Sequence, residues 1–196
     1  MDKDFLDYLF RKTYRSVYQY EQYKDSSINA FNNTLADFRY HYPEKDEDSI
    51  AHAIEFGTGW FVTYLYRLGR SVFLSNNQDP LLQEIHWLMR ELCAAEIYFS
   101  VDIGKGLYVR HGLGTVIGSR CQIGEGLVIH QNCTIGHKKK LGNGPTLLNN
   151  VEIGAGSTLL GDITIGNHVT IGAHSLVLHS FTDGLSIAGT PAKKIK

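Results

Sequence analysis

Residues 117–136 read IGSRCQIGEGLVIHQNCTIG, and residues 151–172 read VEIGAGSTLLGDITIGNHVTIG. In both stretches an aliphatic residue, often followed by glycine, returns every six residues. An earlier set, Ile97, Ile103 and Val109, keeps this spacing but is offset by two residues, which places an insertion at residues 110–114. The main series runs on for eleven repeats: Ile117, Ile123, Ile129, Ile135, Leu141, Leu147, Ile153, Leu159, Ile165, Ile171 and Val177.

A period of six fits neither a helix nor a flat two-layer sheet, and it predicts a solenoid. Each hexapeptide would form one short strand and one turn, with its aliphatic residue in a narrow core. Glycine supplies turn conformations that a side chain would strain. Three hexapeptides close one triangular coil, so residues 97–182 predict four to five coils.

The first half of the chain shows a different pattern. Apolar residues at helical spacing predict helices over residues 4–23, 49–74 and 81–95. A polar linker around Pro43 and a break that ends at Pro80 separate them, because proline does not continue a preceding helix. We therefore expect an α+β protein with a helical N-terminal domain (1–95) and a hexapeptide-repeat domain with a C-terminal tail (96–196).

Composition excludes several classes of protein. The 196 residues carry 19 Lys+Arg and 20 Asp+Glu, a net charge of -1, which disfavours a nucleic-acid binder that depends on bulk charge. No apolar stretch approaches the roughly 20 residues of a membrane span, and the start, MDKDFLDYLF, lacks a signal-peptide pattern. Cys93, Cys121 and Cys133 show no CxxC spacing, so we expect a cytoplasmic protein without disulfides or a cysteine zinc site.

Six segments carry a resemblance to a known family: YRLG at 66–69, IGKGLYVRHGLGTVIG at 103–118, CTIG at 133–136, IGAGSTLLGDITIG at 153–166, IGAHSLVL at 171–178 and AGTPAKKI at 188–195. With them the chain resembles the hexapeptide-repeat acyltransferases, which form left-handed parallel β-helices and work as trimers, and among these the serine O-acetyltransferases. The resemblance covers about residues 60–195. It implies an acetyl-CoA-dependent O-acetyltransferase of cysteine biosynthesis that moves acetyl directly from coenzyme A to a hydroxyl, that of L-serine.

The resemblance also implies the catalytic residues. It makes His111, inside the insertion, the general base, and Glu96 the carboxylate that orients it, where the family has Asp. A histidine suits this role because its unperturbed pKa of about 6.5 lies near working pH. Backbone N–H groups near Gly136 are the implied donors to the oxyanion of the tetrahedral intermediate.

Coenzyme A binding is implied at five positions, of which Gly136 also belongs to the oxyanion site. Ala155 and Ala173 are one full coil apart, and their small side chains let the pantetheine arm approach the backbone. Lys193 and Lys194 are the implied phosphate partners. The loop at residues 137–144 carries three further lysines, which either attract the same phosphates or form a solvated charged segment. No metal is expected.

Two departures from the family leave the acceptor open. Arg110 stands where the family has Asp before the histidine, and Asn143 with Gly144 stands where it has a substrate-binding Arg-His pair. Arg110 and Asn143 are therefore the candidate substrate-binding residues, for L-serine or for a hydroxyl of a sugar or polysaccharide precursor. The chain ends at Lys196 without the tail that docks the family onto cysteine synthase, so that complex is not expected.

Two other classes of protein stay open. Zinc-dependent carbonic anhydrases use the same β-helix, and His111, His130 and His137 would be the zinc ligands, although Gly142 stands where a further histidine is expected. A non-catalytic β-helix scaffold is the third interpretation. For the favoured enzyme we expect a homotrimer, with the helical half pairing trimers into hexamers, and neither nucleic-acid nor membrane partners.

Overall fold

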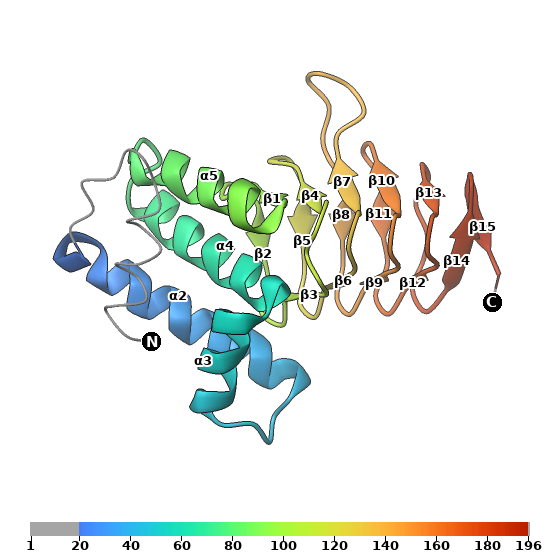
Figure 1. The fold of residues 1–196 in the computed structure, drawn as a ribbon. Helices are drawn as coiled ribbons and strands as arrows, with labels where there is room; N and C mark the ends of the chain where they lie inside the picture. The colour runs from blue at the N-terminus through green and yellow to red at the C-terminus, as the bar shows by residue number, and fades with distance from the viewer. Residues whose placement is uncertain (1–19, 196) are drawn as a thin grey trace.

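The computed structural model describes residues 20–195, as four helices that lead into a column of short strands (Figure 1). The helices are α2 (Tyr20–His41), α3 (Glu47–Phe56), α4 (Thr58–Ser75) and α5 (Leu81–Cys93). None of these described helices is long and apolar enough to cross a bilayer. The strands are β1 (Glu96–Ile97), β2 (Asp102–Ile103), β3 (Tyr108–Val109), β4 (Val116–Ile117), β5 (Gln122–Ile123), β6 (Val128–Ile129), β7 (Thr134–Gly136), β8 (Thr146–Leu147), β9 (Glu152–Ile153), β10 (Thr158–Leu160), β11 (Thr164–Ile165), β12 (Thr170–Ile171), β13 (Leu176–Val177), β14 (Ser186–Gly189) and β15 (Ala192–Lys194).

The strands form the three faces of a triangular column. Sheet A has the order β1-β4-β7-β10-β13, sheet B β11-β8-β5-β2, and sheet C β15-β14-β12-β9-β6-β3. All pairs are parallel except β14 with β15, and successive repeat positions stack in register, as Ile117 does on Ile97 and Ile135. The predicted left-handed parallel β-helix is confirmed, with about five coils. We call the corner between sheets C and A the C/A edge, and the corner between sheets A and B the A/B edge.

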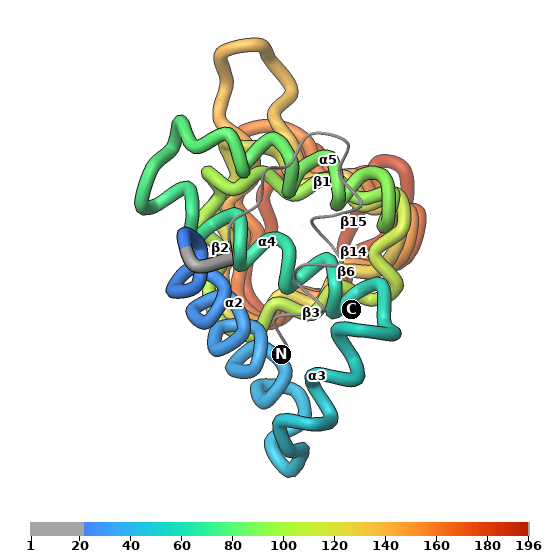
Figure 2. Tube along the Cα trace, turned by 60° about the vertical axis from the view of Figure 1, so that its left-hand side comes forward, coloured from blue at the N-terminus to red at the C-terminus, as the bar shows by residue number. Residues whose placement is uncertain are grey.

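One repeat position is not part of the column. Leu141 is 93% exposed, so the expectation that it points into the core was wrong. Consecutive core positions such as Ile117 and Ile123 are six residues apart, whereas Ile135 in β7 and Leu147 in β8 are twelve apart. The six additional residues leave the column as a loop, called here the 137–144 loop, which projects beyond the sheets in Figures 1 and 2. Because the insertion is one period long, it leaves the spacing of the repeats unchanged.

The helices also differ from the expected pattern. The predicted helix 4–23 lies mostly outside the described residues. Helix α2 extends to His41, where the sequence predicted no helix. The apolar pattern is weak there because the buried face of α2 includes the polar side chains of Ser27 and Thr34. The predicted helix 49–74 is two helices. They separate at Gly57, whose backbone is extended (φ -109°, ψ 108°) while its N–H still donates to the carbonyl of Ala53.

Helix α4 lies across the open end of the column (Figure 2) and supplies hydrogen bonds to the first coil. Each coil donates N–H groups to carbonyls of the next, so the first coil keeps carbonyls with no preceding coil to pair with. The Tyr66 hydroxyl donates to the carbonyl of Val101 (2.8 Å), and the Arg67 guanidinium donates to those of Ile103 (2.8 Å) and Gly104 (2.7 Å). The helix therefore satisfies backbone groups that would otherwise lie buried and unpaired.

A buried ion pair fixes this helix to α2. Nε and Nη2 of Arg67 donate to the two oxygens of Asp37, each at 2.8 Å. The N–H groups of Gly106 (2.7 Å) and Leu107 (3.1 Å), in the first coil, donate to the same carboxylate. Burial raises the pKa of the Asp37 carboxyl, while Arg67 and the two N–H donors act in the opposite direction. Asp37 thus joins α2 and α4 to the coil that precedes the insertion at residues 110–114.

Helix α4 also packs directly on that insertion. A Cβ at Gly59 would lie 1.9 Å from the carbonyl oxygen of Val109 and 3.3 Å from the backbone nitrogen of His111. On the other side of the contact, a Cβ at Gly112 would meet Val62 at 3.2 Å. Glycine at position 59 therefore lets the helix approach the turn closely enough to define where His111 lies.

The Arg67→Met variant should lose about 3–5 kcal/mol of unfolding free energy, because the buried Asp37 carboxylate loses its charged partner. The matched variant, Arg39→Met, removes an exposed ion pair with Glu47 (3.8 Å) and should lose less than about 1 kcal/mol. Urea unfolding followed by circular dichroism measures both. Equal losses in the two variants would contradict the anchoring role of Arg67.

The Gly59→Ala variant should be less stable although alanine favours helices by about 1 kcal/mol over glycine. Its Cβ forces the turn at His111 away from the helix, at a cost of about 1–3 kcal/mol beyond that gain. We expect the Tm to fall by at least about 3 °C. Gly142→Ala, where the nearest atom is 3.5 Å away, is the control and should leave the Tm unchanged. A higher Tm for Gly59→Ala would show that the close contact is not needed.

Candidate active site on two edges of the β-helix

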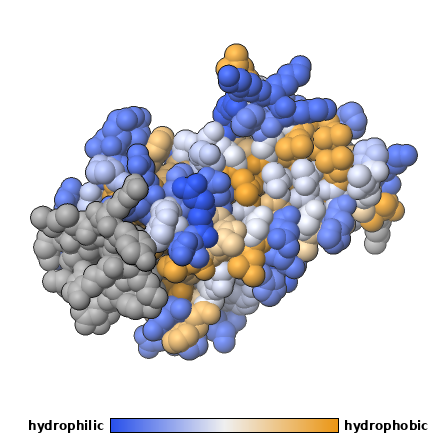
Figure 3. Space-filling model, turned by 45° about the horizontal axis from the view of Figure 1, so that its top comes forward, coloured by the Kyte–Doolittle hydropathy of each residue, from blue (hydrophilic) through white to orange (hydrophobic). Residues whose placement is uncertain are grey.

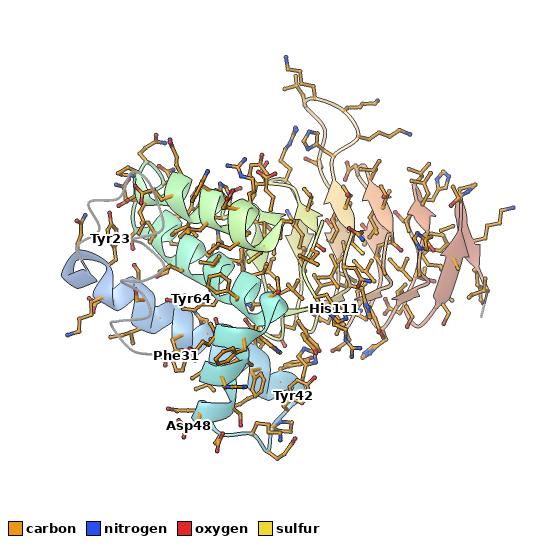
Figure 4. The ribbon with its side chains drawn as sticks, viewed as in Figure 1. Tyr23, Phe31, Tyr42, Asp48, Tyr64 and His111 are labelled. Atoms are coloured by element: carbon orange, nitrogen blue, oxygen red, sulfur yellow. The ribbon has the colours of Figure 1, made fainter. Side chains whose placement is uncertain are left out.

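His111 lies on the C/A edge, beside the N-terminal end of α4 (Figure 4). Its backbone is left-handed (φ 64°), and the neighbouring glycines at 112 and 114 also have positive φ. The turn is closed by the N–H of Gly112, which donates to the carbonyl of Arg110 (2.8 Å), and fixed by that of Gly114, which donates to Ala94 (2.8 Å). The imidazole is exposed on a rigid turn, where it can reach a molecule outside the column.

Arg110 is held by aromatic side chains next to His111. Its guanidinium carbon lies 5.1 Å from the centre of the Tyr108 ring, and that ring stacks on Trp60 at 4.9 Å with an interplanar angle of 12°. Cation–π contacts of this kind restrict a guanidinium that would otherwise move freely in solvent. A fixed positive charge therefore lies one residue from the candidate base.

Glu96 lies at the same end of sheet A. Its N–H donates to the carbonyl of Thr115 (2.9 Å), in the segment that follows the His111 turn. Its Oε1 is 3.7 Å from Nη1 of Arg90, and the described part of the chain shows no hydrogen bond between Glu96 and His111. Glu96 is thus close to the turn in the fold but is paired with another residue.

A different histidine lies beside a carboxylate on this edge, and sequence reasoning missed the pair. Nε2 of His130 is 3.7 Å from Oε1 of Glu152. The N–H of Arg110 donates to Ile129 (2.7 Å), so His130 is directly beside Arg110 in the next coil. The two partners are 22 residues apart, and this spacing includes the six residues that the 137–144 loop adds to the coil. The regular repeat therefore does not predict that they are neighbours.

The candidate coenzyme A positions continue the same edge. The N–H of Gly156 donates to Gln131 (3.0 Å) and that of His174 to Ala155 (2.8 Å), so the corners at Ala155 and Ala173 stack above the His111 turn. Within the described residues the N–H groups of Ala155 and Ala173 make no hydrogen bond. These two donors are available to a ligand that lies along the edge.

The two candidate phosphate partners lie near the last coil. Lys193 and Lys194 are exposed in β15, which pairs antiparallel with β14 at the end of sheet C. The hydroxyl of Thr190, in the turn between these strands, donates to the carbonyl of His174 (3.3 Å). Both lysines therefore belong to the far end of the column from the helices, on the strand that follows this turn.

The other two predicted residues lie elsewhere. Gly136 ends β7 at the A/B edge, and Asn143 lies at the base of the 137–144 loop, where its Nδ2 donates to Oδ2 of Asp162 (3.3 Å). His111 is at the opposite end of the sheet A strands. One chain therefore does not bring Gly136 and Asn143 to His111.

The three histidines of the zinc alternative are divided in the same way. His111 and His130 lie on the C/A edge, whereas His137 is exposed in the 137–144 loop. No group of three potential metal ligands gathers among residues 20–195.

Known proteins match both the sequence and the fold. The family described as "Bacterial transferase hexapeptide (six repeats)" matches residues 144–179. A serine acetyltransferase of Staphylococcus epidermidis is 40% identical over 123 residues, which are 62% of this chain and 58% of that protein. The chain thus spans less than two thirds of this relative's length.

Solved structures extend the similarity to the helices. The serine acetyltransferase of Neisseria gonorrhoeae superposes with a TM-score of 0.77 at 26% identity, over 90% of this chain and 69% of that one. A soybean serine acetyltransferase complexed with serine gives a TM-score of 0.73 at 28% identity, over 87% and 70%. The chain is therefore similar, in sequence and in fold, to serine acetyltransferases with hexapeptide repeats and a left-handed β-helix.

Proposed function

We propose that this protein is an acetyl-CoA-dependent O-acetyltransferase whose acceptor is L-serine. The observation that carries the proposal is the C/A edge, where an exposed histidine on a fixed turn shares a line with two free backbone N–H groups at Ala155 and Ala173. The similarity to serine acetyltransferases, one of them complexed with serine, supports the choice of acceptor.

In the proposed reaction His111 takes the proton of the acceptor hydroxyl as its oxygen attacks the thioester carbonyl. The new C–O bond forms a tetrahedral intermediate, and N–H groups near Gly136 stabilise its oxyanion. The C–S bond then breaks, and His111 returns the proton to the leaving sulfur. Glu96 stabilises the imidazolium once it is released from Arg90.

An acyl-cysteine intermediate is not part of this proposal. Burial raises the pKa of Cys93 to about 12 and that of Cys121 to about 11, and it also raises the pKa of Cys133. A buried, protonated thiol is a poor nucleophile, because the thiolate is the reactive form. Direct transfer from coenzyme A is therefore the simpler route, and three free thiols fit a reducing cytoplasm.

We propose a homotrimer because the two parts of the site lie on different edges of one chain. A head-to-tail ring of three copies brings the A/B edge of each copy to the C/A edge of the next and then closes. Each site would combine His111 of one copy with Gly136 and the 137–144 loop of its neighbour. In this arrangement residues 96–196 form the catalytic domain, and residues 1–95 form the helical domain that pairs trimers into hexamers.

Coenzyme A would lie along the C/A edge in this trimer. The free N–H groups of Ala155 and Ala173 would donate to the pantetheine amides, and Lys193 and Lys194 would neutralise phosphate charge. The loop lysines at 138–140 are exposed and would supply further positive charge on the neighbouring copy.

A sugar or polysaccharide precursor is the second candidate acceptor. The observation in its favour concerns the two candidate substrate residues, since Arg110 lies over the Tyr108 ring and Asn143 donates to Asp162. Neither offers the carboxylate that would hold the ammonium group of serine.

Release of free coenzyme A thiol from acetyl-CoA, measured with L-serine and with a panel of sugars and nucleotide-sugars, tests the function. We expect turnover with L-serine, and the His111→Gln variant should lower kcat by about 10²–10⁴-fold because the base is lost. The control is His52→Gln, an exposed histidine on α3 and outside the β-helix, which should keep wild-type turnover. Turnover with a sugar but not with L-serine would show that the acceptor is a sugar. The absence of turnover with every acceptor would overturn the acyltransferase assignment.

A further inference from the structure

A hollow of about 670 Å³ lies on the face of sheet B and reaches the A/B edge. It lies below the base of the 137–144 loop, which projects from the surface and is hydrophilic over most of its length (Figure 3). Volumes of this order are typical of small-molecule sites. Its polar lining includes Ser100, Ser119, Arg120, Gln122, Asn143 and Asn149.

Arg120 is fixed at the rim of this hollow by the base of the loop. Its carbonyl accepts a hydrogen bond from the N–H of Gly144 (3.0 Å). Gly144 packs so closely here that a Cβ would lie 2.8 Å from Sγ of Cys121 and 2.9 Å from the carbonyl oxygen of Arg120. The loop base and the backbone at the Arg120 corner therefore hold each other in place.

Among the described residues, the two charged side chains that line the hollow leave one cation without an ion-pair partner. Asp102 also lines it, but its Oδ1 is 3.2 Å from Nη2 of Arg70, so this negative charge is already paired. Arg120 is half-buried and makes no ion pair within residues 20–195. The lining thus includes one arginine that is unpaired among the described residues, together with uncharged hydrogen-bonding side chains.

This combination selects a class of ligand. A guanidinium binds a carboxylate through two parallel N–H···O bonds, and such charge-assisted pairs are stronger than neutral hydrogen bonds. Hydroxyl and amide side chains suit the remaining polar groups of a small hydrophilic molecule. A single cation matches a single carboxylate better than the several charges of a phosphate chain.

We propose that this hollow binds the carboxylate of the acetyl acceptor and that Arg120 is the residue that selects acceptors carrying one. The inference rests on the proposed function and deepens it, because it assigns the acceptor to the hydroxy acids. The A/B edge holds Gly136 and Asn143 as well, so His111 of the adjacent copy would face the acceptor there. Arg120 then supplies the positive charge that position 143, an asparagine, does not.

Ligand-observed NMR titration of the full-length protein tests the site in two matched pairs. The pairs are L-serine against L-serinamide and glucuronate against glucose, so each carboxylate has a counterpart without one. The wild type should bind at least one carboxylate about 10- to 100-fold more tightly than its counterpart. Arg120→Gln should remove this preference and leave the affinity for the counterpart unchanged. Arg39→Gln, an exposed arginine on α2, is the control and should keep the preference.

The inference is overturned when the wild type shows no preference in either pair, or when Arg120→Gln keeps it. A thiol-release assay on the same samples separates this result from the wider proposal. If the Arg120→Gln enzyme is active and its KM for the acceptor is unchanged, Arg120 does not bind the acceptor, and the proposed acetyltransferase activity is retained. Arg120-dependent carboxylate binding without turnover by the wild type confirms the site and overturns the acetyltransferase.

Discussion

The carbonyl groups of the first coil are the constraint on which the rest of the structure depends. In a parallel β-helix each coil pairs with the next, so the first one begins with backbone acceptors that nothing in the column can satisfy. The helices supply the missing partners, from Tyr66 and Arg67 on α4, from His41 on α2 at the carbonyl of Gly106 (2.9 Å), and from His86 on α5 at that of Ile97 (3.2 Å). Once this coil is fixed, every later coil is placed by the one before it, and so is the His111 turn.

The triangular column also decides what one chain can do alone. Side chains on one edge stack in a line, which is why His111, Ala155 and Ala173 come together although they are far apart in sequence. Side chains on different edges are separated by a full face, so Gly136 and Arg120 do not reach His111 within the chain. An enzyme built on this fold therefore gains a complete site by placing two edges against each other, and a closed ring does so three times.

The β-helix could be predicted well because the position of a residue within its hexapeptide indicates whether its side chain is buried in the core. The two-residue offset after Val109 revealed the insertion that carries His111. The polar, glycine-bearing sequence at 137–144 indicated a loop, but this loop left no offset in the repeat, so Leu141 still looked like a core residue. Helix α2 was not predicted beyond residue 23 because its buried face carries polar residues such as Asp37, whose partners lie 30 or more residues away. Arg120 could not be predicted as a site residue either, because the other residues that line the hollow are distant from it in the sequence.

The central claim is that each active site is built from two copies, and mixed oligomers test it most directly. One chain carries His111→Ala, and the other lacks residues 137–142, a deletion of one period that keeps the register of the column. With different affinity tags, oligomers containing both chains are isolated and assayed for thiol release. A mixed trimer keeps one intact site of three, so we expect about one third of wild-type activity, although each variant alone is inactive. Mixed oligomers that are as inactive as the two parents would contradict the account.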